Sequence, residues 1–416
     1  MEDLLLSAYQ KLYAALLSLE RFSKGQDLFE NIACIDSFLS EFRNITFVLQ
    51  KSLAHTQYLD VYNSLREIHL INDDCSWLVE KRNEVLKEKP FSLEKTLCLT
   101  IYHPNGAGVF STESFTIEDE EDYSSLIAIV KRVIEKIPAI EVFFSVEFVY
   151  RETGSQRNLF NSIDNGIDAV LSLLKDLNDA ISEEPSRTRV LVLEKINSLH
   201  FHDIPKDTWF VDDFVYYRKD HVFEKGDRFE LITPFNASVR YTEFCKTLGV
   251  SNNGQMIDET FDAFVKMHTF AFSRQKELVP TFLSLTKDGV LSMEMYHSSI
   301  KTTTYRKIHK ISEEIKSGAP IIAVFHVSEM LLYNNPEAFN QDYSYRSRSE
   351  HSELLSFNIV TKEGASQYCI SSEAILEGKK DCMFPTLMRV ETDDSISFMN
   401  PLVEAFQEVV TNLQMR

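Results

Sequence analysis

Long apolar runs are absent from this chain of 416 residues. No stretch of 18 consecutive apolar residues occurs, so the sequence predicts no membrane-spanning helix. The amino-terminal segment MEDLLLSAYQ carries Glu2 and Asp3 where a secretory signal needs positive charge, and no small-residue cleavage site follows. We therefore expect a cytoplasmic protein that does not enter the membrane.

Paired cysteines and the familiar cofactor motifs are missing as well. The six cysteines are scattered without a C-x-x-C pair, which is typical of small buried residues in a reducing compartment. No P-loop, G-x-S-x-G or H-E-x-x-H motif occurs, and the NGAG segment at 105–108 is too short for a dinucleotide-binding loop. We expect no cofactor.

Basic residues are few relative to acidic ones. The chain holds 43 Lys and Arg against 63 Asp and Glu, for a formal net charge of −20. Such a field opposes nonspecific attraction to nucleic acid or anionic lipid, so nucleic acid is not favoured as a partner. The hydrophobic content of 44% is that of a folded protein, and the length predicts two or three domains.

Apolar residues recur at spacings of three and four through the first ninety residues, which predicts amphipathic helices. Four segments show this pattern: the residues before Gly25, then 29–53, 58–71 and 75–88. Asp73 or Asp74 is a candidate N-cap of the fourth helix, and Pro90 ends it. Four such helices with short connections predict an up-down bundle.

The apolar period changes from 3.6 to 2 after residue 91, where strands begin to alternate with helices. One interpretation of the segment RVLVLEKI at 189–196 is another strand. Two strand pairs turn at Lys-Asp-Gly and Lys-Glu-Gly, which predicts antiparallel hairpins around Gly289 and Gly364. The sequence therefore predicts an α+β multidomain fold. Its expected parts are a helical bundle at 1–91, an α+β domain at 92–272, and an α+β domain with two hairpins at 273–416.

Two Arg-Asn pairs stand in the predicted bundle, Arg43-Asn44 and Arg82-Asn83. Neighbouring antiparallel helices would bring the two pairs close together. With Arg82 and Asn83 near the start of its last helix, the bundle resembles the HEPN superfamily of helical domains. Active members of that superfamily cleave RNA with an R-x4-6-H motif, usually across a dimer interface. The resemblance makes Arg82 and Asn83 candidate catalytic residues.

The chain departs from that motif because none of the seven residues after Arg82 is a histidine. Lys87 stands near the expected position, but an exposed lysine is protonated at neutral pH and is a poor general base. The resemblance then implies a noncatalytic scaffold that pairs with itself or with a protein partner through the bundle. It also suggests a bacterial stress or phage-defence role, since such bundles are frequent there. The alternative is an Arg-Asn pair that caps or bridges helices.

A second candidate site combines His200, His202 and Asp213. The spacing resembles the zinc ligands of JAMM-type peptidases, and two imidazoles with a carboxylate make an open zinc site. Phe210 stands where that family has a serine. The site would make the protein a metal-dependent hydrolase. The alternative is a pair of histidines near a strand end, one of them hydrogen-bonded.

A third candidate is the segment DYSYRSRSEHSELL, where Arg346, Arg348 and Glu350 crowd a predicted loop. Two arginines with tyrosine neighbours are suited to bind a phosphate or a carboxylate. The alternative is that these arginines pair with nearby glutamates. The leading hypothesis from the sequence is an interaction or regulatory protein with a noncatalytic bundle and an α+β recognition domain. The other hypothesis is an enzyme, either a ribonuclease or a metal-dependent hydrolase.

Overall fold

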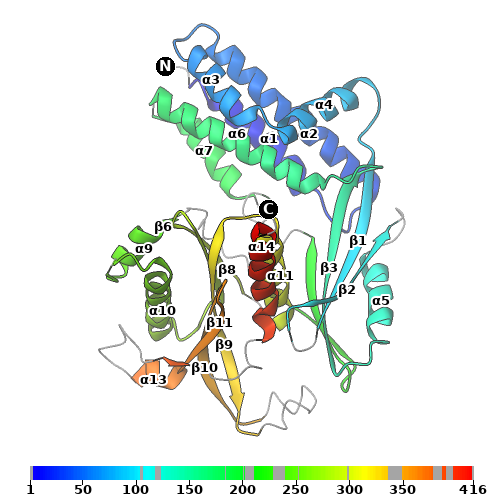
Figure 1. The fold of residues 1–416 in the computed structure, drawn as a ribbon. Helices are drawn as coiled ribbons and strands as arrows, with labels where there is room; N and C mark the ends of the chain where they lie inside the picture. Colours follow the sequence, from blue (N-terminus) through cyan, green and yellow to red (C-terminus); the bar gives the residue numbers. More distant parts are fainter. Residues whose placement is uncertain are drawn as a thin grey trace. The chain divides into compact units, whose positions relative to one another are not determined.

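The computed structural model confirms an α+β fold, with helices at the amino end followed by two sheets (Figure 1). The residues that it describes are 3–103, 106–117, 123–182, 184–199, 201, 210–227, 239–251, 253–297, 299–335, 349–377, 387–389 and 397–414. Among the described residues, no helix is both long enough and apolar enough to cross a membrane.

The chain forms two compact units that alternate along the sequence. The first unit contains residues 1–99, 113–132 and 146–211, and the second contains residues 100–112, 133–145 and 212–416. The expected division at 91 and 272 assumed that each domain is one continuous segment. The chain instead contributes to each unit more than once, and unit boundaries fall within the strands β1, β2 and β3.

The helices of the first unit form a bundle that the first ninety residues do not complete. Its helices are α1 (Leu6–Glu20), α2 (Leu28–Leu53), α3 (Leu59–Leu70), α4 (Asp73–Lys87), α6 (Leu159–Ile181) and α7 (Arg187–Asn197). The four predicted helices are confirmed. The later helix α6 packs against α3 and α4, and α7 packs against α1 (Figure 1). The first four helices thus bury apolar faces against α6, which begins about 70 residues after α4 ends, and against α7, which begins about 100 residues after it.

Helix α7 corrects the interpretation of residues 189–196 as a strand. Ser186 caps this helix, since its hydroxyl accepts the Arg189 N–H at 3.2 Å. The Arg189 side chain is buried and pairs with Asp3 at 3.3 Å, which ties α7 to the start of the chain. The alternating valines and leucines suggested a strand, but the cap and these tertiary contacts favour a helix.

Two local features shape the packing of α4. Its N-cap is Asn72, rather than Asp73 or Asp74, because the Asn72 amide oxygen accepts the Cys75 N–H at 2.8 Å. Gly166 of α6 faces α4 so closely that a Cβ atom there would lie 2.4 Å from Leu78 Cδ1 and 3.3 Å from Phe42 Cζ. Glycine therefore allows α6 to approach α2 and α4.

A five-stranded sheet has the order β2-β1-β3-β4-β5. Its strands are β1 (Leu93–Tyr102), β2 (Val109–Thr116), β3 (Glu141–Glu152), β4 (Val211–Tyr217) and β5 (Val222–Lys225). Helix α5 (Tyr123–Ile134) lies between β2 and β3 in the chain. The sheet has β2 at one edge and β5 at the other.

The second unit contains a seven-stranded sheet with the order β12-β11-β10-β9-β7-β8-β6. Its strands are β6 (Val239–Arg240), β7 (Thr281–Thr286), β8 (Val290–Met295), β9 (Ile321–Tyr333), β10 (His351–Thr361), β11 (Gly364–Ser371) and β12 (Met388–Arg389). Both predicted hairpins are confirmed as antiparallel pairs, β7 with β8 and β10 with β11. The short helices α9 (Tyr241–Thr247) and α13 (Ser372–Glu377) and the 3-10 helix η3 (Ser397–Met399) lie in the same unit.

Helices cover both faces of this sheet. Helix α10 (Met256–Gln275) packs on the face that carries Leu283, Phe325 and Phe357. Helices α11 (Lys301–Lys316) and α14 (Asn400–Gln414) lie side by side and belong to the core of the opposite face, which includes Phe282 and Val324 (Figure 1). Because neighbouring strand residues point to opposite faces, the strands feed two separate cores.

Candidate functional site

The Arg-Asn pairs of α2 and α4 lie close together in the first unit, as the antiparallel arrangement predicts. The guanidinium carbon of Arg43 lies 4.4 Å from the centroid of the Phe47 ring, and that of Arg82 lies 5.9 Å from it. Arg82 Nη1 donates to the Asn83 side-chain oxygen at 3.1 Å. The two arginines therefore share one aromatic ring, which is 44% exposed.

A third arginine, Arg66 of α3, belongs to the same group. Burial lowers the pKa of Arg43, and the positive charges of Arg82 and Arg66 lower it further. Burial raises the pKa of the Tyr62 phenol, and Arg66 and Arg43 oppose that rise. Tyr62 is buried and donates its hydroxyl to the Thr46 carbonyl at 3.2 Å. We call Arg43, Arg66 and Arg82, with Phe47, the arginine cluster.

The arginine cluster carries no compensating carboxylate among the described residues. Arg43 Nη1 donates to the Thr46 hydroxyl at 2.6 Å, which is a neutral acceptor. Arg82 Nε is buried and has no hydrogen-bond partner in the described part of the chain. Three cations from three helices are thus held near one another with no counter-charge from the residues that the structure describes, an arrangement that is suited to bind an anion.

RNA cleavage at the arginine cluster would need a general base beside it. The described histidines of α2, α3 and their connection do not supply one. These are His55, which is exposed in the turn after α2, and His69. His69 Nε2 lies 2.8 Å from an Asp176 carboxylate oxygen of α6, so this ring is engaged elsewhere in the bundle. Neither of these two histidines therefore replaces the one that the R-x4-6-H motif lacks.

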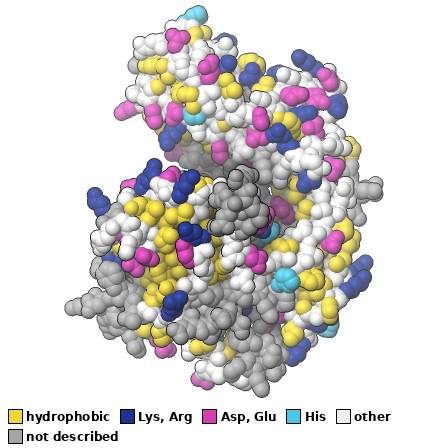
Figure 2. All heavy atoms as spheres, viewed as in Figure 1, with side chains coloured by type: hydrophobic (Ala, Val, Ile, Leu, Met, Phe, Trp, Pro, Cys, Tyr) yellow, Lys and Arg dark blue, Asp and Glu magenta, His cyan; other side chains and the backbone are white. Residues whose placement is uncertain are grey.

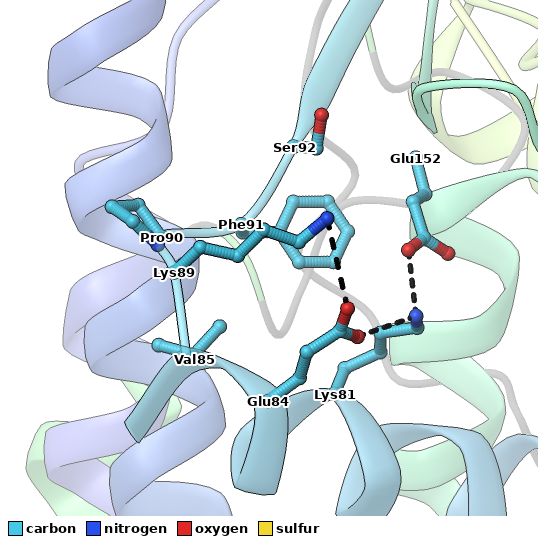
Figure 3. A pocket seen from close by; sticks show the side chains of 8 residues that line it. All are labelled: Lys81, Glu84, Val85, Lys89, Pro90, Phe91, Ser92 and Glu152. Atoms are coloured by element: carbon cyan, nitrogen blue, oxygen red, sulfur yellow. Dashed lines mark hydrogen bonds and ion pairs between the residues drawn. The ribbon is translucent and has the colours of Figure 1, made fainter. Parts of the chain in front are cut away.

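The segment that follows Arg82 lines a small pocket at the end of α4 (Figure 3). Lys81 Nζ lies 2.7 Å from Glu84 and 2.6 Å from Glu152, and Lys89 Nζ lies 3.8 Å from Glu84. Phe91 and Ser92 close the pocket beside them. Two lysines and two glutamates balance one another here, so this pocket joins α4 to β3 and offers no free charge to a ligand.

The predicted zinc site is described only at Asp213, because His200 and His202 lie outside the described residues. Asp213 is buried in β4, where its carboxylate accepts from Arg306 Nε at 3.0 Å, from Thr303 at 2.9 Å and from Ser145 at 2.7 Å. These donors occupy both carboxylate oxygens. No group of three or more metal-ligating side chains occurs among the described residues. The zinc site stays a prediction.

The predicted recognition loop lies mostly outside the described residues, which include Glu350 but not Arg346 or Arg348. Glu350 is exposed, and its carbonyl accepts the Asn334 N–H at 3.2 Å just before β10 begins. The binding role of this loop stays a prediction.

Sequence reasoning missed Arg66, Phe47 and Tyr62 as members of the site. Arg66 and Phe47 are exposed positions on helices, where the apolar period carries no information. A signal was present in that Phe47 is a large apolar residue on the polar side of α2. On the face shown in Figure 2, basic and acidic side chains are interspersed over the helices of the first unit. Charge composition alone therefore does not reveal the cluster.

Comparisons of this chain with protein-family models, with curated proteins and with solved structures found no match. The resemblance to the HEPN superfamily accordingly stays a prediction.

Proposed function

We propose that this protein is a cytoplasmic interaction or regulatory protein whose helical bundle is a noncatalytic binding module. The module binds an anionic group on a partner protein through the arginine cluster. One observation supports this proposal above all others. Arg43, Arg66 and Arg82 come together from three helices without a carboxylate partner among the described residues.

Positive charges held near one another disfavour the folded state unless a counter-ion joins them. A bound carboxylate or phosphate would offset that repulsion, because each guanidinium offers forked donors that match two acceptor oxygens. Arg82 Nε is already buried without a partner, so a ligand oxygen would satisfy it. The exposed ring of Phe47 adds an apolar surface next to the charges.

A protein ligand fits the net charge of −20 better than a nucleic acid does. A long polyanion meets the acidic surface at many points, and the field of the whole chain opposes its approach. A short acidic segment is different, because at physiological ionic strength the Debye length is about 8 Å. Such a segment senses mainly the arginines that it touches. A stress or phage-defence role belongs to this proposal through the HEPN resemblance alone.

A ribonuclease is the second candidate, and one observation favours it. Arg82 and Asn83 are hydrogen-bonded to each other beside two further arginines, an arrangement that would hold a phosphodiester. Cleavage by the ribose 2′-hydroxyl also needs a group that takes its proton. Incubation of total RNA with the protein and with Arg82→Ala separates the two functions. The binding-module proposal predicts no cleavage by either protein, whereas cleavage that Arg82→Ala abolishes would favour the enzyme.

Calorimetric titration with a glutamate-rich octapeptide, at about 0.15 M salt, tests the binding function. The matched glutamine octapeptide measures binding that does not depend on charge. We expect the acidic peptide to bind at least tenfold more tightly than the neutral one, and Arg82→Gln to remove the difference. Arg187→Gln is the control, since Arg187 is an exposed arginine at the start of α7 in the same unit.

A further inference from the structure

The four edges of the two sheets are protected to different degrees. β5 has four residues and ends in Glu224 and Lys225, and β6 and β12 have two residues each. Very short strands and charged side chains are the usual means by which proteins keep sheet edges from pairing with other chains. β2 differs, because it is an edge strand of eight residues.

The sequence of β2, VFSTESFT, contains no proline and no lysine, and Glu113 is its one charged residue. Six of its eight side chains are exposed, among them Phe110 at 60% and Phe115 at 47%. Valine, threonine and phenylalanine favour extended backbone. The strand thus has the composition of one that pairs on both sides, and Glu113 is the one charge along its eight residues.

β1 occupies one side of β2. The His103 N–H donates to the Gly108 carbonyl at 2.8 Å at one end of the pair, and the Ile117 N–H donates to the Lys95 carbonyl at 2.9 Å at the other. No second strand neighbours β2 in the described part of the chain. The outward N–H and C=O groups of β2 are therefore a template for one more strand.

We propose that the added strand is β2 of a second copy of this chain, in an antiparallel pair centred on Thr112. A twofold axis perpendicular to a sheet requires one residue to face its own copy, because paired residues must point to the same side. Only the axes at Thr112 and Glu113 pair all but one residue of the strand. The axis at Glu113 sets two carboxylates opposite each other, which is unfavourable.

The axis at Thr112 pairs residues 109–115 of the strand. It sets Thr112 opposite Thr112, Ser111 opposite Glu113, Phe110 opposite Ser114, and Val109 opposite Phe115 of the second copy. The Thr112 pair and the pair of Val109 with Phe115 are of kinds that favour sheet pairing. The other two pairs set a serine opposite Phe110 and opposite Glu113, and neither places like charges opposite each other. This inference is independent of the arginine cluster, which lies on the helices of the bundle.

Light scattering of the full chain after size separation, over a hundredfold range of concentration, tests the pairing. We expect a dimer that dissociates on dilution. Thr112→Lys and Thr112→Glu should each weaken the dimer at least tenfold, because each sets like charges opposite each other. A mixture of the two variants should dimerise again, since Lys then faces Glu. Recovery in the mixture also shows that both variants fold.

Thr188→Lys, at an exposed threonine of α7, is the control and should dimerise like the natural chain. A natural chain that stays monomeric at every concentration would overturn the inference. It would be overturned as well if both Thr112 variants dimerised normally, or if their mixture stayed monomeric while each kept its circular dichroism spectrum.

Discussion

Arg43 and Arg82 come from different helices and place their guanidinium groups over the same ring, at 4.4 Å and 5.9 Å from the centroid of Phe47. This contact sets two positive charges near each other without a carboxylate between them among the described residues. In the absence of a ligand, the pair is a source of repulsion rather than of stability. An arginine whose role is to bind a ligand should be dispensable for folding.

Arg82→Gln should leave the free energy of unfolding within about 0.5 kcal/mol of the natural value, or raise it, because it removes a like charge. Arg157→Gln is the matched contrast, since Arg157 forms an ion pair with Asp74 and lies over the Trp77 ring at 5.4 Å. That change should cost about 1 kcal/mol. Urea unfolding measures both. An equal loss in the two variants would assign Arg82 a structural role.

We predict that the close contact of α6 with α4 requires a glycine at position 166. Gly166→Ala should destabilise the chain by about 1–3 kcal/mol, although alanine is the better helix former, because its Cβ would overlap Leu78. Ser172→Ala, at an exposed position of the same helix, should be neutral or slightly stabilising. Thermal unfolding compares the two. A stabilised Gly166→Ala variant would mean that the helices have room to separate.

The ion pair of Asp213 with Arg306 is predicted to be strongly coupled, because both side chains are nearly buried, with exposures of 4% and 12%. Arg306→Met should cost about 3 kcal/mol, since it removes a charged partner from a buried carboxylate. In the background of Asp213→Asn, the same change should cost much less. A double-mutant cycle by urea unfolding gives the coupling energy. Equal costs in the two backgrounds would contradict this account of Asp213.

Two buried histidines predict a dependence of stability on pH. Burial lowers the pKa of His268 to about 3 and that of His326 to about 3 in the folded state. Unfolded histidine takes up its proton near pH 6.5, so the unfolded state binds more protons below that pH. Stability is therefore full above pH 6.5 and falls as the pH decreases towards 3. Between pH 7 and pH 5 the loss should be about 2 kcal/mol per histidine, or about 4 kcal/mol together.

Urea unfolding at pH 7, 6 and 5 measures this slope. His326→Gln should reduce the slope by about half, because His326 then no longer contributes a proton difference. His55→Gln changes an exposed histidine in the turn after α2 and serves as the control. A free energy of unfolding that stays constant from pH 7 to pH 5 would contradict this account, because it would mean that these histidines take up protons over the same pH range in the folded and unfolded chains.

Local sequence patterns predicted most helices and hairpins of the fold. They did not predict which distant segments of the chain pack against one another. The apolar spacing of α1 to α4 and the turns at Gly289 and Gly364 were readable because they depend on neighbouring residues. The packing of α6 and α7 onto the bundle was not readable, since it depends on contacts between segments far apart in the chain. Likewise, the local pattern of residues 189–196 favours a strand, because the ion pair of Arg189 with Asp3 joins residues far apart in the chain.

The candidate site was partly predictable for the same reason. Two Arg-Asn pairs on neighbouring antiparallel helices suggested that Arg43 and Arg82 would meet, and they share the ring of Phe47. Arg66 reaches the same place from a third helix, and its position depends on how α3 packs against α2. The sequence suggests Asp213 as a metal ligand. In the structure its carboxylate instead accepts hydrogen bonds from Arg306 and Thr303, which belong to a helix about 90 residues later in the chain.

The most direct test of the binding function is the titration of the glutamate-rich octapeptide into the natural chain and into a variant with Arg43→Gln, Arg66→Gln and Arg82→Gln combined. The account predicts saturable binding to the natural chain, and at least a tenfold loss in the triple variant while its unfolding free energy is retained. Binding that is unchanged in the triple variant, or no difference between the acidic and neutral peptides with the natural chain, would contradict it.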